Sequence, residues 1–142
     1  VSVVGGASSD LQDLLATAAR RQGRILMPEP TPENGFYYRS DHFNFAKAGV
    51  PALYIKVGID DRERGAEWGV ARRREHELTV YHTTADEYRQ GMDVRGGVED
   101  LQLLYAVGRE LAYGRGVPQW RPDSEFRAVR ERSLAADGRK RR

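Results

Sequence analysis

Two adjacent aromatic residues, Tyr81 and His82, form the segment of this chain with the clearest chemical potential. They follow the apolar residues Leu78-Thr79-Val80 and precede Thr83-Thr84-Ala85-Asp86. A neutral imidazole is a common zinc ligand, and a phenol can donate a hydrogen bond to an oxyanion. No HExxH or paired-histidine spacing accompanies His82, so residue types alone favour a structural histidine there. For Tyr81, the alternative is an aromatic strand residue that faces the core.

A second segment, Arg39-Ser40-Asp41-His42, combines a guanidinium, a carboxylate and an imidazole. An arginine can hold a carboxylate through two parallel hydrogen bonds. Asp41 and His42 are adjacent at the expected start of a helix, where their side chains point apart, so we do not expect them to bind one ion together. A solvated or structural role remains the alternative for Arg39.

Apolar periodicity and glycine positions predict the elements that position these segments. An opening strand is expected to enter a glycine turn at Gly5-Gly6, and Gly23 is expected to end the first helix. The predicted elements are helices over 10–22, over about 41–48 and through 101–111, strands over 24–27, 52–57 and 78–81, and a surface loop over 59–77. Helices that alternate with buried strands indicate an α/β layered domain, although the visible strands are few.

Composition narrows the classes of partner. The formal net charge is +2, which is too small to indicate nucleic-acid binding. The excess of basic over acidic residues lies from Arg127 to Arg142, which is typical of a solvated terminus. The chain has no cysteine and no apolar stretch of the roughly 18 residues that a membrane span requires. Neither nucleic acid nor a transmembrane segment is therefore expected.

The two segments, in this order and with this gap, resemble the C-terminal half of the di-zinc aminopeptidases of peptidase family M28, relatives of glutamate carboxypeptidase and glutaminyl cyclase. The resemblance is carried by Ser40-Asp41-His42 and by Tyr81-His82-Thr83-Thr84 with Asp86. It implies a three-layer α/β/α zinc-exopeptidase (phosphorylase/hydrolase-like) fold of which only the C-terminal part is present. Residues 1–114 would be part of the catalytic domain, and residues 115–142 a tail that is basic at its end, which Trp120 and Phe126 could pin to the surface.

The resemblance also implies a role for each candidate residue. His82 would be a terminal ligand to one of two zinc ions, and Tyr81 would lie over the scissile carbonyl. Arg39 would hold the substrate backbone or a terminal carboxylate, and Trp68 would line the entrance to the cleft. Supporting positions beside the metal site would be taken by Asp41, His42 and Asp86.

By this resemblance, the intact protein is expected to be a secreted, periplasmic or envelope-associated zinc exopeptidase that hydrolyses N-terminal peptide bonds. The family's other metal ligands and its catalytic glutamate would lie upstream of Val1, so residues 1–142 alone are expected to be inactive. Two alternatives stay open. One is a non-catalytic pseudoenzyme or dimerisation module of the same fold, and the other is a glutaminyl-cyclase-like acyltransferase. The oligomeric state is not predicted.

Overall fold

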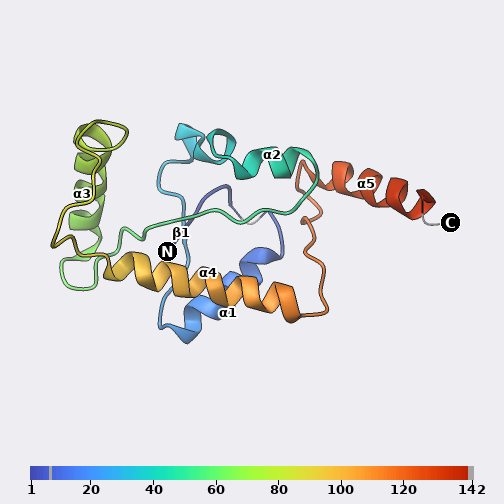
Figure 1. The fold of residues 1–142 in the computed structure, drawn as a ribbon, viewed down its shortest axis with the longest axis horizontal. Coiled ribbons are helices and arrows are strands. Elements are labelled where there is room, and N and C mark those ends of the chain that lie inside the picture. The colour runs from blue at the N-terminus through green and yellow to red at the C-terminus, as the bar shows by residue number, and fades with distance from the viewer. Residues whose placement is uncertain (7, 141–142) are drawn as a thin grey trace.

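The fold consists of a small sheet and five α-helices in the part of the chain that the computed structural model describes, residues 1–6 and 8–140 (Figure 1). In chain order the elements are β1 (Ser2–Val3), α1 (Leu11–Arg21), β2 (Met27–Pro28), the 3-10 helices η1 (Pro32–Asn34) and η2 (Phe36–Arg39), α2 (His42–Lys47), β3 (Ile55–Lys56), α3 (Gly65–Thr79), α4 (Arg95–Tyr113) and α5 (Arg127–Lys140). No helix in the described ranges is long and apolar enough to cross a membrane.

The sheet has the strand order β2-β1-β3. β1 runs parallel to β2, with Ser2 opposite Met27, and antiparallel to β3, with Ser2 opposite Lys56. The chain is therefore mixed α/β, as predicted. The three-layer zinc-exopeptidase fold is not established by a sheet of two-residue strands. The strand expected over 52–57 is reduced to Ile55–Lys56, because β1 offers only two residues for pairing.

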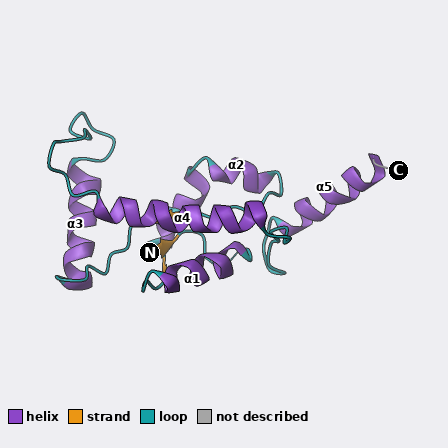
Figure 2. Ribbon diagram, turned by 60° about the horizontal axis from the view of Figure 1, so that its bottom comes forward, coloured by secondary structure: helices purple, strands orange, loops and turns teal. Residues whose placement is uncertain are grey.

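One core cluster joins the sheet to α1 and α4, which lie side by side in both ribbon views (Figures 1 and 2). The predicted helix over 10–22 is confirmed as Leu11–Arg21. Gly23 ends it with a positive φ of 66°, which glycine adopts without steric cost. The buried members of this cluster are Val1, Val3, Leu15, Ala18, Ala19, Leu103 and Val107.

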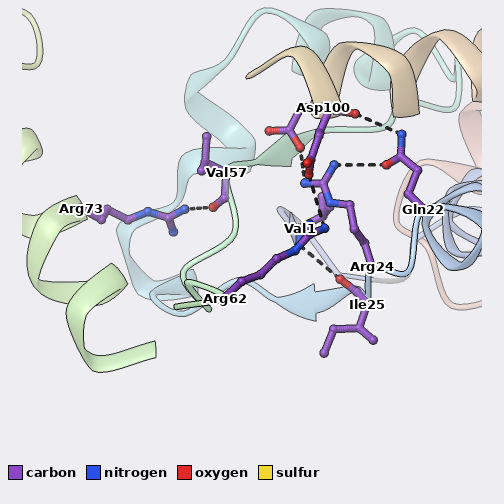
Figure 3. Close-up of polar contacts among 9 residues, drawn as sticks. Val1, Gln22, Arg24, Ile25, Val57, Arg62, Arg73 and Asp100 are labelled. Atoms are coloured by element: carbon purple, nitrogen blue, oxygen red, sulfur yellow. Dashed lines mark hydrogen bonds and ion pairs between the residues drawn. The ribbon is translucent and has the colours of Figure 1, made fainter. Parts of the chain in front are cut away.

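An ion pair between Arg24 and Asp100 fastens the first turns of α4 to the chain that leaves α1 (Figure 3). The two side chains are only 12% and 15% exposed. Gln22 supports the pair, since its Nε2 donates to the Glu99 carbonyl at 3.3 Å and its Oε1 accepts from Arg24 at 3.3 Å. Removing either partner would leave a charge with little water to solvate it.

A second core cluster lies against the other face of β1, because neighbouring residues of an extended chain point to opposite sides. Val3 belongs to the first cluster and Val4 to the second. Trp120 and Phe126 complete the second cluster at 4% and 7% exposure. The expectation that these two residues pin the tail is thus confirmed, and they are buried in the core rather than resting on its surface.

We call residues 119–126 the strap, since their contacts tie distant segments together. Trp120 Nε1 donates to the buried Gly49 carbonyl at 2.9 Å. The Arg121 N–H donates to the Ser8 carbonyl at 2.9 Å, and its guanidinium pairs with Asp13 at 2.8 Å. After the strap, α5 extends away from the rest of the molecule (Figure 1).

The predicted surface loop over 59–77 is confirmed only for residues 59–64, since α3 occupies Gly65–Thr79. The predicted strand over 78–81 was wrong, because α3 continues through Thr79 and a turn follows it. Residues 71–78 are alanine, arginine, glutamate, histidine and leucine, mostly good helix formers. Arg72 pairs with Glu75 one turn on. Thr79 Oγ1 donates to the Glu75 carbonyl at 2.7 Å, so this β-branched residue ends the helix instead of starting a strand.

Candidate functional site

Tyr81 and His82 lie on the turn that directly follows α3. The N–H groups of Val80 and Tyr81 both donate to the His76 carbonyl at 2.9 Å, which closes the end of the helix. His82 then adopts a φ of 59°, which is uncommon for a residue with a Cβ. This reversal brings the two rings into a stack, with centroids 3.8 Å apart and planes 22° from parallel.

Hydrogen bonds within the turn hold His82 in this conformation. The backbone N–H of His82 donates to Asp86 Oδ2 at 3.4 Å. Thr83 Oγ1 donates to the Val80 carbonyl at 2.7 Å and accepts from the Ala85 N–H at 3.1 Å. Asp86 therefore orients the backbone of His82 and not its second ring nitrogen.

Both rings are open to solvent. Tyr81 is 49% exposed, and His82 is also exposed. An exposed imidazole beside an exposed phenol can offer a nitrogen lone pair and an O–H donor to the same bound molecule. The turn is thus chemically suited to one metal ligand and one oxyanion donor.

A pair of cations surrounds Phe36 at the start of η2. The Arg39 guanidinium carbon lies 6.0 Å from the ring centroid and Lys56 Nζ lies 3.1 Å from it. Burial lowers the pKa of Lys56; Glu77 opposes that effect, whereas the charges of Arg73 and Arg39 add to it. Arg39 and Lys56 thus both lie near the Phe36 ring.

The sequence interpretation did not include Lys56 among the site residues. Its signal was nevertheless visible, because Lys56 is the one charged residue in the otherwise apolar run from Ala52 to Val57. A lone charge on a β-strand usually has a partner or a function. The strand β3 carries it to the ring of Phe36, which no local pattern predicts.

His42 is packed as an aromatic residue on α2. Its ring lies 4.6 Å from that of Tyr37 and 4.9 Å from that of Tyr54. Burial lowers the pKa of His42 and the charge of Asp41 opposes the shift. Asp41 is the residue before the helix, but its carboxylate makes no capping bond. Among the described residues, no group of three potential metal ligands includes Asp41 or His42.

Trp68 lies on α3, so it does not belong to a loop at a cleft entrance. It is 37% exposed. The guanidinium carbons of Arg64 and Arg72 lie 4.4 and 6.0 Å from its ring centroid. In the described part of the chain, the Trp68 ring therefore lies against two arginine side chains.

The candidate site residues do not gather at one place in the structure. The contacts of Tyr81 and His82 lie within residues 76–86, whereas Arg39 and His42 contact residues around η2 and α2. Within residues 1–6 and 8–140, no group of three or more histidine, aspartate or glutamate side chains is placed to hold a metal ion. A catalytic zinc ion needs about three protein ligands, so these residues do not fit a zinc site by themselves.

Comparison with known proteins gives one match. A family model described as Peptidase family M28 matches residues 1–97, a range that contains both the Arg39–His42 segment and the Tyr81–His82 turn. Residues 98–142, which include most of α4, the strap and α5, lie outside the match. The searches of curated proteins and of solved structures found no match.

Proposed function

This chain belongs to peptidase family M28, and from this premise we propose that it is part of a zinc-dependent exopeptidase of the aminopeptidase type. The observation that carries the proposal is the stack of Tyr81 on His82 on a solvent-exposed turn. It presents a potential metal ligand beside a potential oxyanion donor, the two groups that amide hydrolysis at a metal needs from this part of a site.

Each residue then has a distinct proposed role. His82 is the candidate metal ligand, through whichever ring nitrogen is deprotonated. The Tyr81 hydroxyl donates a hydrogen bond to the oxygen that becomes negative when the peptide carbonyl is attacked. Arg39, which lies near the Phe36 ring as Lys56 does, binds the carboxylate of a short peptide substrate.

The remaining zinc ligands are proposed to come from residues other than those described. One histidine on a turn cannot hold two zinc ions, since each catalytic zinc needs about three protein ligands. We assign the catalytic glutamate and the other metal ligands of the intact enzyme to these residues outside the described ranges. A secreted, periplasmic or envelope-associated location is part of the same proposal.

The test is an assay of the intact, zinc-loaded protein on aminoacyl-anilides and on peptides with a glutamine N-terminus. We expect release of the N-terminal residue, loss of turnover after chelation and recovery on adding zinc. Formation of pyroglutamate without hydrolysis would instead support the cyclase-like alternative. A protein that holds zinc and cleaves no N-terminal bond would reject the aminopeptidase assignment.

A non-catalytic role is the second candidate, and one observation favours it: the described residues do not assemble three metal ligands at any point. In that case the Tyr81–His82 turn would be an exposed surface feature. The same assay decides, because a non-catalytic module shows no turnover at any zinc concentration.

A further inference from the structure

The helix α4 carries an apolar stripe on its exposed side in addition to the face that it buries. Leu103 and Val107 belong to the first core cluster, where α1 packs along α4 (Figures 1 and 2). At 3.6 residues per turn, a second set of apolar and small residues falls on the opposite side of the helix. All of these residues are exposed, and we call them the seam: Val94, Val98, Leu101, Tyr105, Gly108 and Ala112.

The spacing of the seam indicates what kind of structure would cover it. Its members are separated alternately by four and three residues, which is the pattern that lets two helices pack side by side in a coiled coil. Leu101 and Tyr105, near its middle, are 68% and 72% exposed, and large apolar side chains in a row mark interaction surfaces. A Cβ at Gly108 would meet no neighbouring atom within 4 Å, so a second helix has room to approach there.

The two borders of the seam differ in charge. One border is basic, with Arg95, Gln102 and Arg109, and the other is uncharged, with Gly97, Leu104 and Leu111. Arg95 pairs with Asp93 at 2.6 Å, whereas none of the ion pairs of the described residues includes Arg109. Acidic side chains on a covering helix would therefore gain an ion pair at Arg109.

A second copy of α4 does not offer this complementarity. Two antiparallel copies would place the basic border against itself, so that Arg95 of one copy would repel Arg109 of the other. Two parallel copies would place the basic border against the uncharged one and would gain no ion pair. The charges thus favour a helix of different sequence.

We propose that the seam of α4 is a docking surface for one amphipathic helix of a partner protein, a helix with an apolar stripe and with acidic residues along the border that faces Arg109. The surface is separate from the proposed peptidase residues, because Arg39, Tyr81 and His82 lie on other segments. Residues 98–113 of α4 also lie outside the family match. The proposal therefore does not depend on the chain being catalytic.

The test is titration of the intact protein with two synthetic helical peptides of about three heptads each. Both peptides carry a leucine stripe with the same alternating spacing, but one has glutamates along its borders and the other has lysines. We expect saturable binding of the glutamate peptide and roughly tenfold weaker binding of the lysine peptide, with a difference that shrinks as salt is added. Fluorescence anisotropy of the labelled peptides measures both affinities.

Matched variants locate the binding on α4. Leu101→Ser and Tyr105→Ser each shorten an exposed side chain of the seam and should weaken binding of the glutamate peptide roughly tenfold. Arg109→Glu should reverse the preference, so that the lysine peptide binds more tightly than the glutamate peptide. Glu110→Ala removes an exposed carboxylate of the same helix outside the seam and should leave both affinities unchanged. Thermal melts of the variants check that each of them folds.

Three results would overturn the proposal: equal affinity for the two peptides, no saturation up to about 100 μM, or an equal loss of binding with Glu110→Ala. Sedimentation of the intact protein provides a further test. A dimer that Tyr105→Ser abolishes would also overturn the proposal, because a second copy of the chain would then occupy the seam.

Discussion

The rings of Tyr81 and His82 stack 3.8 Å apart because His82 adopts a φ of 59°. Neighbouring residues of a regular strand would point to opposite faces, and the two groups could not act on one molecule. The positive φ costs of order 1–3 kcal/mol at a residue with a Cβ. The hydrogen bond from the His82 N–H to Asp86 and those of Thr83 offset part of this cost. Such strain is often retained at functional sites.

The first prediction concerns the Tyr81 hydroxyl in the intact, zinc-loaded protein. Tyr81→Phe should lower kcat by roughly 10²–10³-fold with little change in KM, because an oxyanion donor acts mainly in the transition state. The ring and its stack on His82 are kept in this variant. Steady-state kinetics on an aminoacyl-anilide provide the measurement, and equal kcat values for the two proteins would contradict the role.

The second prediction concerns the cations around Phe36. Arg39→Ala should raise KM and leave kcat nearly unchanged, since a contact to the substrate carboxylate is present in the ground state and the transition state alike. Lys56→Met should act in the same direction. Arg74→Ala removes an exposed arginine of α3 and serves as the control. A lower melting temperature with unchanged KM would assign Arg39 a structural role instead.

Elements with strong apolar periodicity could be predicted from the sequence. The helix over residues 11–21 buries Leu11, Leu15 and Ala18, which the periodicity places on one face. The later helix was also predicted, but it buries Leu103 and Val107, whereas Leu101, Leu104 and Tyr105 on its expected apolar face are exposed. The end of the first helix follows from Gly23, whose positive φ of 66° glycine adopts without steric cost. Gly114 follows the last residue of α4 in an extended conformation, with φ −73° and ψ 164°.

The turn that carries the candidate site could not be predicted in the same way. Leu78, Thr79 and Val80 have the composition of a strand, but the preceding helix continues through Thr79 and uses its hydroxyl. Short apolar runs of this kind are ambiguous between helix and strand. The contact of Lys56 with Phe36 joins two segments 20 positions apart, so only the folded chain shows it.

The third prediction tests the strap. Trp120→Ala should lower the free energy of unfolding by about 3–5 kcal/mol, because it empties a buried site and leaves the Gly49 carbonyl without its donor. Tyr113→Ala removes a side chain that is 85% exposed and should change stability by less than about 0.5 kcal/mol. Urea unfolding of the three proteins measures the difference, and similar midpoints for all of them would show that Trp120 does not hold the strap.

The fourth prediction concerns pH. Burial lowers the pKa of His42 below its usual value of 6.5, so near that pH the unfolded chain binds more protons than the folded one. Stability should therefore be highest above that pH and fall as the pH drops through the lowered pKa. His42→Phe keeps an aromatic ring between Tyr37 and Tyr54 and should show a smaller fall. Urea midpoints measured across the acid range report both curves, and parallel curves would contradict burial of a neutral His42.

The last prediction concerns metal content. Within the described residues, His82 is the one side chain that we assign to zinc, and no cluster of three potential ligands surrounds it. Because a catalytic zinc ion needs about three protein ligands, residues 1–142 purified alone should retain fewer than about one zinc ion per chain after dialysis and should hydrolyse no peptide. His82→Ala should reduce the retained zinc further, whereas His76→Ala should not. Elemental analysis of the three proteins measures this directly. Two firmly held zinc ions per chain, or turnover that a chelator abolishes, would show that this chain holds a complete metal site.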